Sequence, residues 1–229
     1  MSVEVSGILT AAHELKAPLC LIRQLSLALS MATDAKVKHR LECQIVEVSD
    51  RALRQVNDLA RVARLEDGLF ATEPVSVRGV CRAVLQEIEP LFHYEQRSLK
   101  VKFSNKSRLA VANRDLLYSI IYNFCVNAVH YSEPESLSLL SVSDNQGKIR
   151  VKVRDFGPAL PVKIWRAICA GNLSEPTAIT MRPSSSGLGL YISAQFARHM
   201  HAQLGAVRHH DGTSFFIDLP VSQQTLLAF

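Results

Sequence analysis

The sequence predicts an α+β fold in which a two-helix hairpin precedes an α/β sandwich. Two long apolar heptad stripes near the N-terminus predict the hairpin. Alternating strand and helix patterns after Gly68, and a strong turn signal at Asp211-Gly212, predict the sandwich. A chain of 229 residues can hold two small domains, which we expect at residues 1–68 and 69–229.

The first predicted helix covers residues 3–30 and carries a heptad seam. The seam consists of Ile8, Ala12, Leu15, Leu19, Ile22, Ser26 and Leu29. Thr33 and Asp34 supply a break and a cap for a second helix, which we expect to end at Gly68. Its stripe consists of Leu41, Ile45, Val48, Ala52, Val56, Leu59 and Ala63.

A single hairpin cannot bury both apolar stripes well. Pairing of two copies into a four-helix bundle solves this problem, so a homodimer is expected. The pattern also fits a two-helix leader that packs on the following domain, and the stripes alone leave this alternative open.

The pattern after Gly68 predicts a mixed sheet with helices on one face. Strands are expected at residues 75–77, 99–103, 109–112, 137–142, 149–153, 204–209 and 214–219. Helices are expected at residues 80–92, 115–131 and 188–201. Residues 157–186 are rich in Pro, Ser and Gly and are expected to be irregular.

Composition excludes several classes of protein. The net charge is +5, but acids and bases are interleaved without a dense basic block, so no nucleic-acid partner is expected. The five cysteines are scattered and form no C-x-x-C pair, which argues for a reducing, cytoplasmic compartment. No signal peptide or membrane span is predicted, although a membrane sensor region could precede the chain in a longer parent.

His13 lies in the first predicted helix, beside the seam residue Ala12, and should face solvent. A neutral imidazole there is a competent nucleophile, because its ordinary pKa is about 6.5. Glu14 could hold one ring nitrogen and leave the other free to attack phosphorus. Pro18 cannot donate to the carbonyl of Glu14, so the helix should bend or loosen here. The alternative is an ordinary surface histidine.

Three further segments indicate a nucleotide site. Asn123 and Asn127 are four residues apart on one helix face, and their neutral amides suit a triphosphate with Mg²⁺. Asp155 follows a strand and stands near Gly157, where its carboxylate could accept a hydrogen bond from an adenine amino group. Glycines at the start of the helix after residue 186 would expose backbone N–H groups to phosphate.

These segments occur in the order of the H, N, G1 and G2 boxes of sensor histidine kinases, which they resemble. The boxes correspond to residues 13–19, 123–132, 155–159 and 185–190. The resemblance covers nearly the whole chain and implies a HisKA-type dimerisation domain followed by a GHKL-type (Bergerat) ATP-binding domain. It departs from the family at Ala159 and Ser185, where glycines are usual, and no F-box is recognisable near Trp165.

The resemblance implies roles for individual residues. Asn127 would ligate Mg²⁺, Asn123 would help to position phosphate, and Tyr131 would line the adenine pocket. The remaining residues assigned to ATP by the resemblance are His130, Asp155, Gly157, Gly187, Leu188 and Gly189. ATP-hydrolysing relatives carry glutamate where Asn123 stands, and an amide cannot accept a proton from water. The phosphoryl group is thereby reserved for His13.

The implied function is ATP-dependent phosphorylation of His13, with Glu14 as its orienting residue, followed by transfer to an aspartate of a response regulator. The main alternative is a degenerate scaffold or phosphotransfer protein that binds a response regulator with little kinase activity. A GHKL serine kinase or ATPase is disfavoured by His13 and Asn123, and no P-loop motif exists.

Overall fold

The computed structural model describes residues 15–104, 108–133, 135–173 and 187–223. The chain divides into two compact units. The first contains residues 1–64 and 174–192, and the second contains residues 65–173 and 193–229. The predicted domain boundary between residues 68 and 69 stays a prediction.

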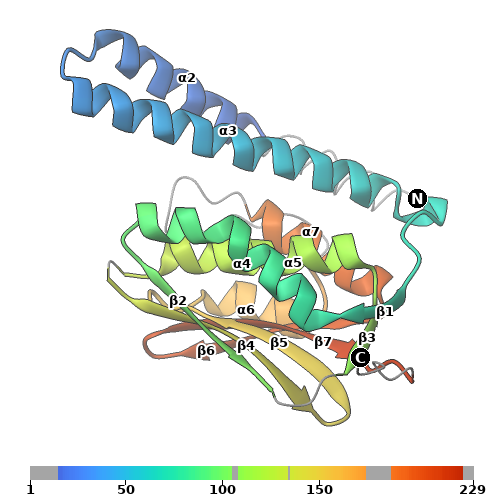
Figure 1. The fold of residues 1–229 in the computed structure, drawn as a ribbon. Coiled ribbons are helices and arrows are strands. Elements are labelled where there is room, and N and C mark those ends of the chain that lie inside the picture. The colour runs from blue at the N-terminus through green and yellow to red at the C-terminus, as the bar shows by residue number, and fades with distance from the viewer. Residues whose placement is uncertain (1–14, 105–107, 134, 174–186, 224–229) are drawn as a thin grey trace. The chain divides into compact units, whose positions relative to one another are not determined.

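The first unit contains the expected helical hairpin, formed by α2 (Lys16–Met31) and α3 (Ala35–Ala63), which lie side by side in Figure 1. Asp34 caps α3 as predicted, because its carboxylate accepts hydrogen bonds from the N–H groups of Lys36 and Val37 at 2.8 and 2.9 Å. Over the described residues, α2 and α3 confirm two predicted helices, and the Asp34 cap confirms the predicted break between them.

The end of α3 differs from the prediction. The helix stops at Ala63 and a short 3₁₀ turn, η1 (Leu65–Asp67), separates it from Gly68. Gly68 has a φ of 71°, so its left-handed backbone ends this turn rather than the α-helix itself.

The second unit contains two sheets. A short antiparallel pair is made by β1 (Glu73–Ser76) and β3 (Leu109–Ala112). The main sheet has the strand order β2-β4-β5-β7-β6 and is mixed, because β2 runs parallel to β4 while the other pairs are antiparallel. Its strands are β2 (Ser98–Phe103), β4 (Leu137–Asn145), β5 (Lys148–Arg154), β6 (Gln203–His209) and β7 (Gly212–Pro220).

Helices cover one face of the main sheet, as predicted (Figure 1). They include α4 (Val77–Tyr94), α5 (Arg114–Tyr131) and α6 (Val162–Cys169), while α7 (Leu188–His199) begins in the first unit and ends in the second. Phe124 of α5 stacks on Phe215 of β7, with ring centroids 5.8 Å apart, and both side chains are buried. This contact joins the helical layer to the sheet in the core.

Helix α6 corrects the expectation that residues 157–186 are irregular. Ile164 and Ile168 are four residues apart, so they share the buried face of this helix. Pro161 stands directly before the helix, where its missing N–H costs nothing. The abundance of Pro and Gly around these eight residues concealed the helical period. Val77 is a second correction, since it begins α4 instead of ending the first strand.

Loop and helix groups cover the free edge of β6. The indole N–H of Trp165 donates to the carbonyl oxygen of Ala206 at 3.0 Å, and Arg208 Nε donates to the Leu160 carbonyl at 2.6 Å. These bonds occupy backbone and side-chain groups that an unprotected edge strand would present to another chain. Within the described residues, no helix is long and apolar enough to cross a membrane.

Candidate functional site

Helix α5 positions the two asparagines predicted to meet nucleotide. The helix begins after Asn113, whose side chain accepts hydrogen bonds from the N–H groups of Asp115 and Leu116. Asn123 and Asn127 lie between residues buried in the core, and both remain partly exposed. The amide nitrogen of Asn123 lies 3.5 Å from Ser193 Oγ, at the long limit of a hydrogen bond.

The end of α5 is tied to the turn that follows β5. Ser132 is buried at the C-cap of α5, and its hydroxyl lies 3.1 Å from that of Ser138. It also accepts a hydrogen bond from the N–H of Phe156, at 3.4 Å. The Glu133 N–H donates to the Phe156 carbonyl at 2.9 Å. The asparagine helix and the turn that follows β5 are therefore held together.

Gly157 lies against the backbone of α5. A Cβ atom added at this position would overlap the Tyr131 carbonyl oxygen, which belongs to the backbone and has no freedom to move aside. Only glycine fits this approach. The backbone that Gly157 approaches belongs to Tyr131, the last residue of α5.

Asp155 is held by the hairpin of β6 and β7. Its Oδ1 accepts a hydrogen bond from the Thr213 N–H at 2.8 Å, and its own N–H donates to the Thr213 carbonyl at 2.9 Å. Gly212 packs directly on the Asp155 backbone, where a Cβ atom would collide with its carbonyl group. These contacts fix the carboxyl group through Oδ1. Among the described residues, no donor forms a hydrogen bond to Oδ2.

The electrostatics of Asp155 are unusual for an aspartate. The side chain is 2% exposed, and burial raises its pKa from 3.8 to about 6. The Thr213 backbone hydrogen bond and the charge of Arg154 oppose this rise without cancelling it. A buried carboxyl group with one unused oxygen is suited to bind a ligand that brings its own hydrogen-bond donor.

The other predicted residues are placed as follows. His130 and Tyr131 are partly exposed in the last turn of α5. In the first unit, Gly187 has a φ of 70° directly before α7, and Leu188 and Gly189 form the first residues of that helix. His13 and Glu14 lie outside the described residues.

The residues of this site suit a Mg²⁺ ion that is held mainly by the phosphates of a nucleotide. No group of three or more His, Cys, Asp or Glu side chains that could hold a metal occurs in the described part of the chain. Mg²⁺ in phosphoryl-transfer sites is usually held by one or two protein oxygens together with substrate phosphates and water. The amide oxygen of partly exposed Asn127 fits that limited role.

Two supporting contacts of the site were not predicted from the sequence. Ser132 joins the end of α5 to the turn at Phe156, and Thr213 is the hydrogen-bond partner of Asp155. The signal for Thr213 was its place directly after the Asp211-Gly212 turn, which fixes its backbone beside β5. No local pattern shows that Ser132 meets Phe156, since the two are 24 residues apart.

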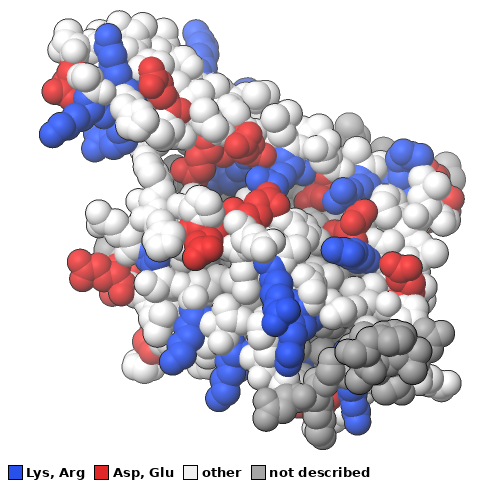
Figure 2. Space-filling view, in the orientation of Figure 1, with Lys and Arg blue, Asp and Glu red and all other residues white. Residues whose placement is uncertain are grey.

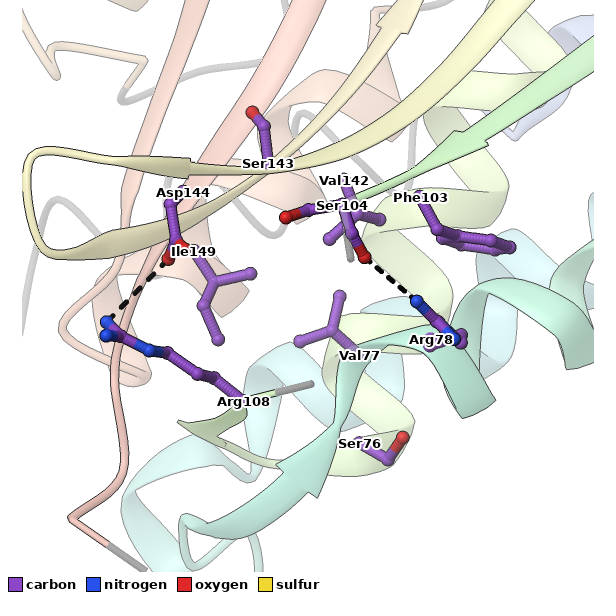
Figure 3. A pocket seen from close by; sticks show the side chains of 10 residues that line it. All are labelled: Ser76, Val77, Arg78, Phe103, Ser104, Arg108, Val142, Ser143, Asp144 and Ile149. Atoms are coloured by element: carbon purple, nitrogen blue, oxygen red, sulfur yellow. Dashed lines mark hydrogen bonds and ion pairs between the residues drawn. The ribbon is translucent and has the colours of Figure 1, made fainter. Parts of the chain in front are cut away.

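A hollow elsewhere in the second unit contains none of the predicted nucleotide residues (Figure 3). Arg78 donates to the Ser104 carbonyl at 2.9 Å, and Arg108 lies 3.8 Å from Asp144. Both arginines are thus engaged by the protein, and we assign no ligand to this hollow.

Part of the chain matches a known protein family. Residues 112–223 match the family described as "Histidine kinase-, DNA gyrase B-, and HSP90-like ATPase". This segment contains both asparagines, Asp155, Gly157 and Thr213. This part of the chain belongs to that family.

Relatives extend the similarity over nearly the whole chain. Histidine protein kinase SaeS of Staphylococcus aureus (strain USA300) is 25% identical over 215 residues, which cover 91% of this chain and 61% of SaeS. The chain thus spans about three fifths of that relative. The similarity and the family match confirm the resemblance to a sensor histidine kinase core.

Solved structures share the fold. Acinetobacter baumannii histidine kinase AdeS aligns with a TM-score of 0.66 at 16% identity, over 92% of this chain and 98% of AdeS. Histidine kinase ThkA, in a complex with response regulator protein TrrA, aligns with a TM-score of 0.62 at 17% identity, over 92% of this chain and 60% of ThkA. At these identities the comparisons show the α+β fold of a histidine kinase core.

Proposed function

We propose that this chain uses ATP to phosphorylate itself on His13 and then passes the phosphoryl group to an aspartate of a response regulator. The observation that carries the proposal is Asp155, a buried carboxyl group fixed by Thr213 with one oxygen free for a ligand. The family of residues 112–223 and the similarity to SaeS support it.

In this proposal the residues assigned to nucleotide from the sequence bind ATP. Asp155 Oδ2 accepts a hydrogen bond from the adenine amino group, and the turn at Gly157 brings backbone close to the base. Tyr131 lines the adenine pocket and His130 lies beside it. Asn123 positions phosphate and Asn127 holds the accompanying Mg²⁺, which neutralises phosphate charge when it is bound. Gly187, Leu188 and Gly189 contribute backbone N–H groups to phosphate.

The transfer step follows from the chemistry of imidazole. One ring nitrogen of His13 attacks the γ-phosphorus, and the bond between that phosphorus and the β–γ bridging oxygen breaks, so ADP leaves. Glu14 hydrogen-bonds the other ring nitrogen and takes up its proton. Because Asn123 is an amide, the site has no carboxylate at this position to activate water. Transfer to His13 is therefore favoured over hydrolysis.

The helical hairpin is proposed to act as a homodimer that docks a receiver domain in the cytoplasm. Large apolar side chains on α2 and α3 are exposed in the single chain, including Leu19 at 61%, Met31 at 82% and Leu53 at 62%. Exposed apolar surface of this kind usually marks a protein interface. ThkA, which shares the fold, has been solved with a response regulator.

The homodimer predicts a mass of about twice 25.4 kDa by light scattering at micromolar concentration. Replacing Leu19 and Leu53 with Glu places charges within the apolar surface and should shift the mass toward that of one chain. A variant with Glu at Gln24 and Asn57, two exposed polar residues, serves as the control. If the unmodified chain is a monomer at micromolar concentration, the proposed four-helix bundle is wrong.

Incubation with γ-labelled ATP and Mg²⁺ tests the kinase. We expect label on the chain that is lost in acid and retained in base, as a phosphoramidate requires. Asn127→Ala should reduce the rate at least about tenfold, because it removes a positioning oxygen from the metal. Acid-stable label would show that a hydroxyl group is the acceptor and would contradict the proposal.

The departures at Ala159 and Ser185 favour a second candidate, a scaffold that binds a response regulator without kinase activity. Absence of label, together with retained binding to a response regulator, would establish this alternative.

A further inference from the structure

The main sheet has a second face, which α4, α5 and α6 do not cover (Figure 1). Val151, Val153 and Ile217 are buried and point toward the helices, so their neighbours along each strand point the opposite way. The registers place these neighbours in rows across the sheet. One row is Lys100, Leu139, Arg154, Ser214 and Val207, and the next is Lys102, Ser141, Lys152, Phe216 and Gly205.

Basic residues dominate this face. We name it the basic sheet face, defined by Lys100, Lys102, Arg150, Lys152 and Arg154. Figure 2 shows Lys and Arg side chains projecting from the lower part of the view, where the sheet lies in Figure 1. The acidic side chains that contact these five residues are Asp218 and Asp211.

The two arginines are already engaged by those carboxylates. Arg150 donates to both oxygens of Asp218, at 2.7 and 2.6 Å, and Arg154 donates to Asp211 at 2.7 Å. The guanidinium of Arg150 is therefore occupied by a paired hydrogen bond, and Arg154 is held by a single bond while its Nη1 is buried. The charge left for a partner belongs to Lys100, Lys102 and Lys152, none of which is paired with a carboxylate among the described residues.

The three lysines give the face a diffuse positive potential. A lysine ammonium is a mobile point charge on a long stem and does not impose a planar geometry on its partner. Burial is the largest cause of the lowered pKa of His209, at the edge of the same face. The charges of Arg154, Lys152 and His210 lower this pKa further, and the charge of Asp211 opposes them.

The only aromatic ring in the two rows is closed to ligands. The ring of Phe216 covers Gly205, where a Cβ atom would overlap it, and the guanidinium carbon of Arg150 lies 3.9 Å from the ring centroid on the basic sheet face. Single-stranded nucleic acids are usually bound by open aromatic rings on which bases stack. The closed ring argues against such a partner, while exposed Val207 adds apolar surface at the margin.

From this charge complementarity we infer that the basic sheet face binds the headgroup layer of an anionic phospholipid bilayer. A layer of this kind presents many mobile negative charges in one plane, and free lysines attract it without specific geometry. The inference concerns a surface outside the nucleotide site and is independent of the proposed kinase activity.

Co-sedimentation with vesicles tests this inference. The unmodified chain should bind vesicles of phosphatidylcholine mixed with phosphatidylglycerol, should not bind phosphatidylcholine alone, and should lose binding as salt is raised. Replacing Lys100, Lys102 and Lys152 together with Glu should weaken binding at least about tenfold. A matched variant with Glu at Lys36, Lys38 and Lys163 has the same net charge and should keep most of the affinity.

Thermal melting establishes whether both variants are folded. If the variant at Lys100, Lys102 and Lys152 is unfolded, a variant with Gln at Lys100 and Lys102 alone replaces it. No binding of the unmodified chain to the anionic vesicles overturns the inference. Equal losses in the two triple variants also overturn it, because they would reflect net charge alone. Binding of single-stranded DNA that depends on the same three lysines, without vesicle binding, would identify a nucleic-acid surface instead.

Discussion

Gly157→Ala is expected to destabilise the second unit severely and to abolish nucleotide binding at ordinary concentrations. The added Cβ atom would overlap the Tyr131 carbonyl oxygen, so either the end of α5 or the turn after Asp155 must move. Overpacking against backbone should cost about 3 kcal/mol or more. That cost lowers the melting temperature by roughly 6–12 °C, since each kcal/mol corresponds to about 2–4 °C at this size.

Gly79→Ala is the matched control. A Cβ atom at Gly79 lies 3.4 Å from Ser76 Oγ, an ordinary contact, and alanine favours a helix over glycine by about 0.5–1 kcal/mol. Its melting temperature should be unchanged or higher, and its nucleotide affinity unchanged. If Gly157→Ala melts and binds ATP like the unmodified chain, the close packing of the two predicted motifs is wrong.

Asp155→Asn is expected to stabilise the protein while weakening nucleotide binding by at least about tenfold. The pKa of Asp155 is raised to about 6, so the folded state binds its proton more tightly than the unfolded state. The unmodified chain therefore loses stability as pH rises from about 4 through 6. The full loss, roughly 3 kcal/mol above pH 6, follows from 1.36 kcal/mol per pKa unit.

Asparagine carries no charge and keeps an oxygen for the Thr213 N–H, so the variant escapes this loss. Its gain in melting temperature should be largest near pH 8, should shrink as pH falls below 6 and should nearly vanish near pH 4. Asp115→Asn, at an exposed position, controls for the substitution itself and should change stability by less than about 1 kcal/mol. A gain independent of pH would show that burial of charge is not its source.

Local patterns predicted most of the fold. Alternating steps of three and four gave α2 and α3, and a capping carboxylate at Asp34 gave the break between them. The turn signal at Asp211-Gly212 predicted the hairpin of β6 and β7, and alternating patterns predicted β4 and β5. Helix α6 was missed because only two buried isoleucines mark its period between Pro and Gly residues.

The candidate site residues come from the sequence and stay predictions, and their supporting contacts were not predicted. Asn127 and Asp155 stand out because neutral amides and a carboxylate at a strand end suit nucleotide chemistry. Ser132 and Thr213 support the site through contacts between segments distant in sequence, and such contacts leave no local signature. His13 was predicted from its helical context, and its role stays a prediction because it lies outside the described residues.

We expect His13 to accept the phosphoryl group, and labelling of the unmodified chain beside His13→Gln tests this expectation. Both proteins are incubated with γ-labelled ATP and Mg²⁺ after their melting temperatures and ATP affinities are shown to agree. We expect acid-labile label on the unmodified chain and none on His13→Gln. Label on His13→Gln at the stoichiometry of the unmodified chain would contradict it.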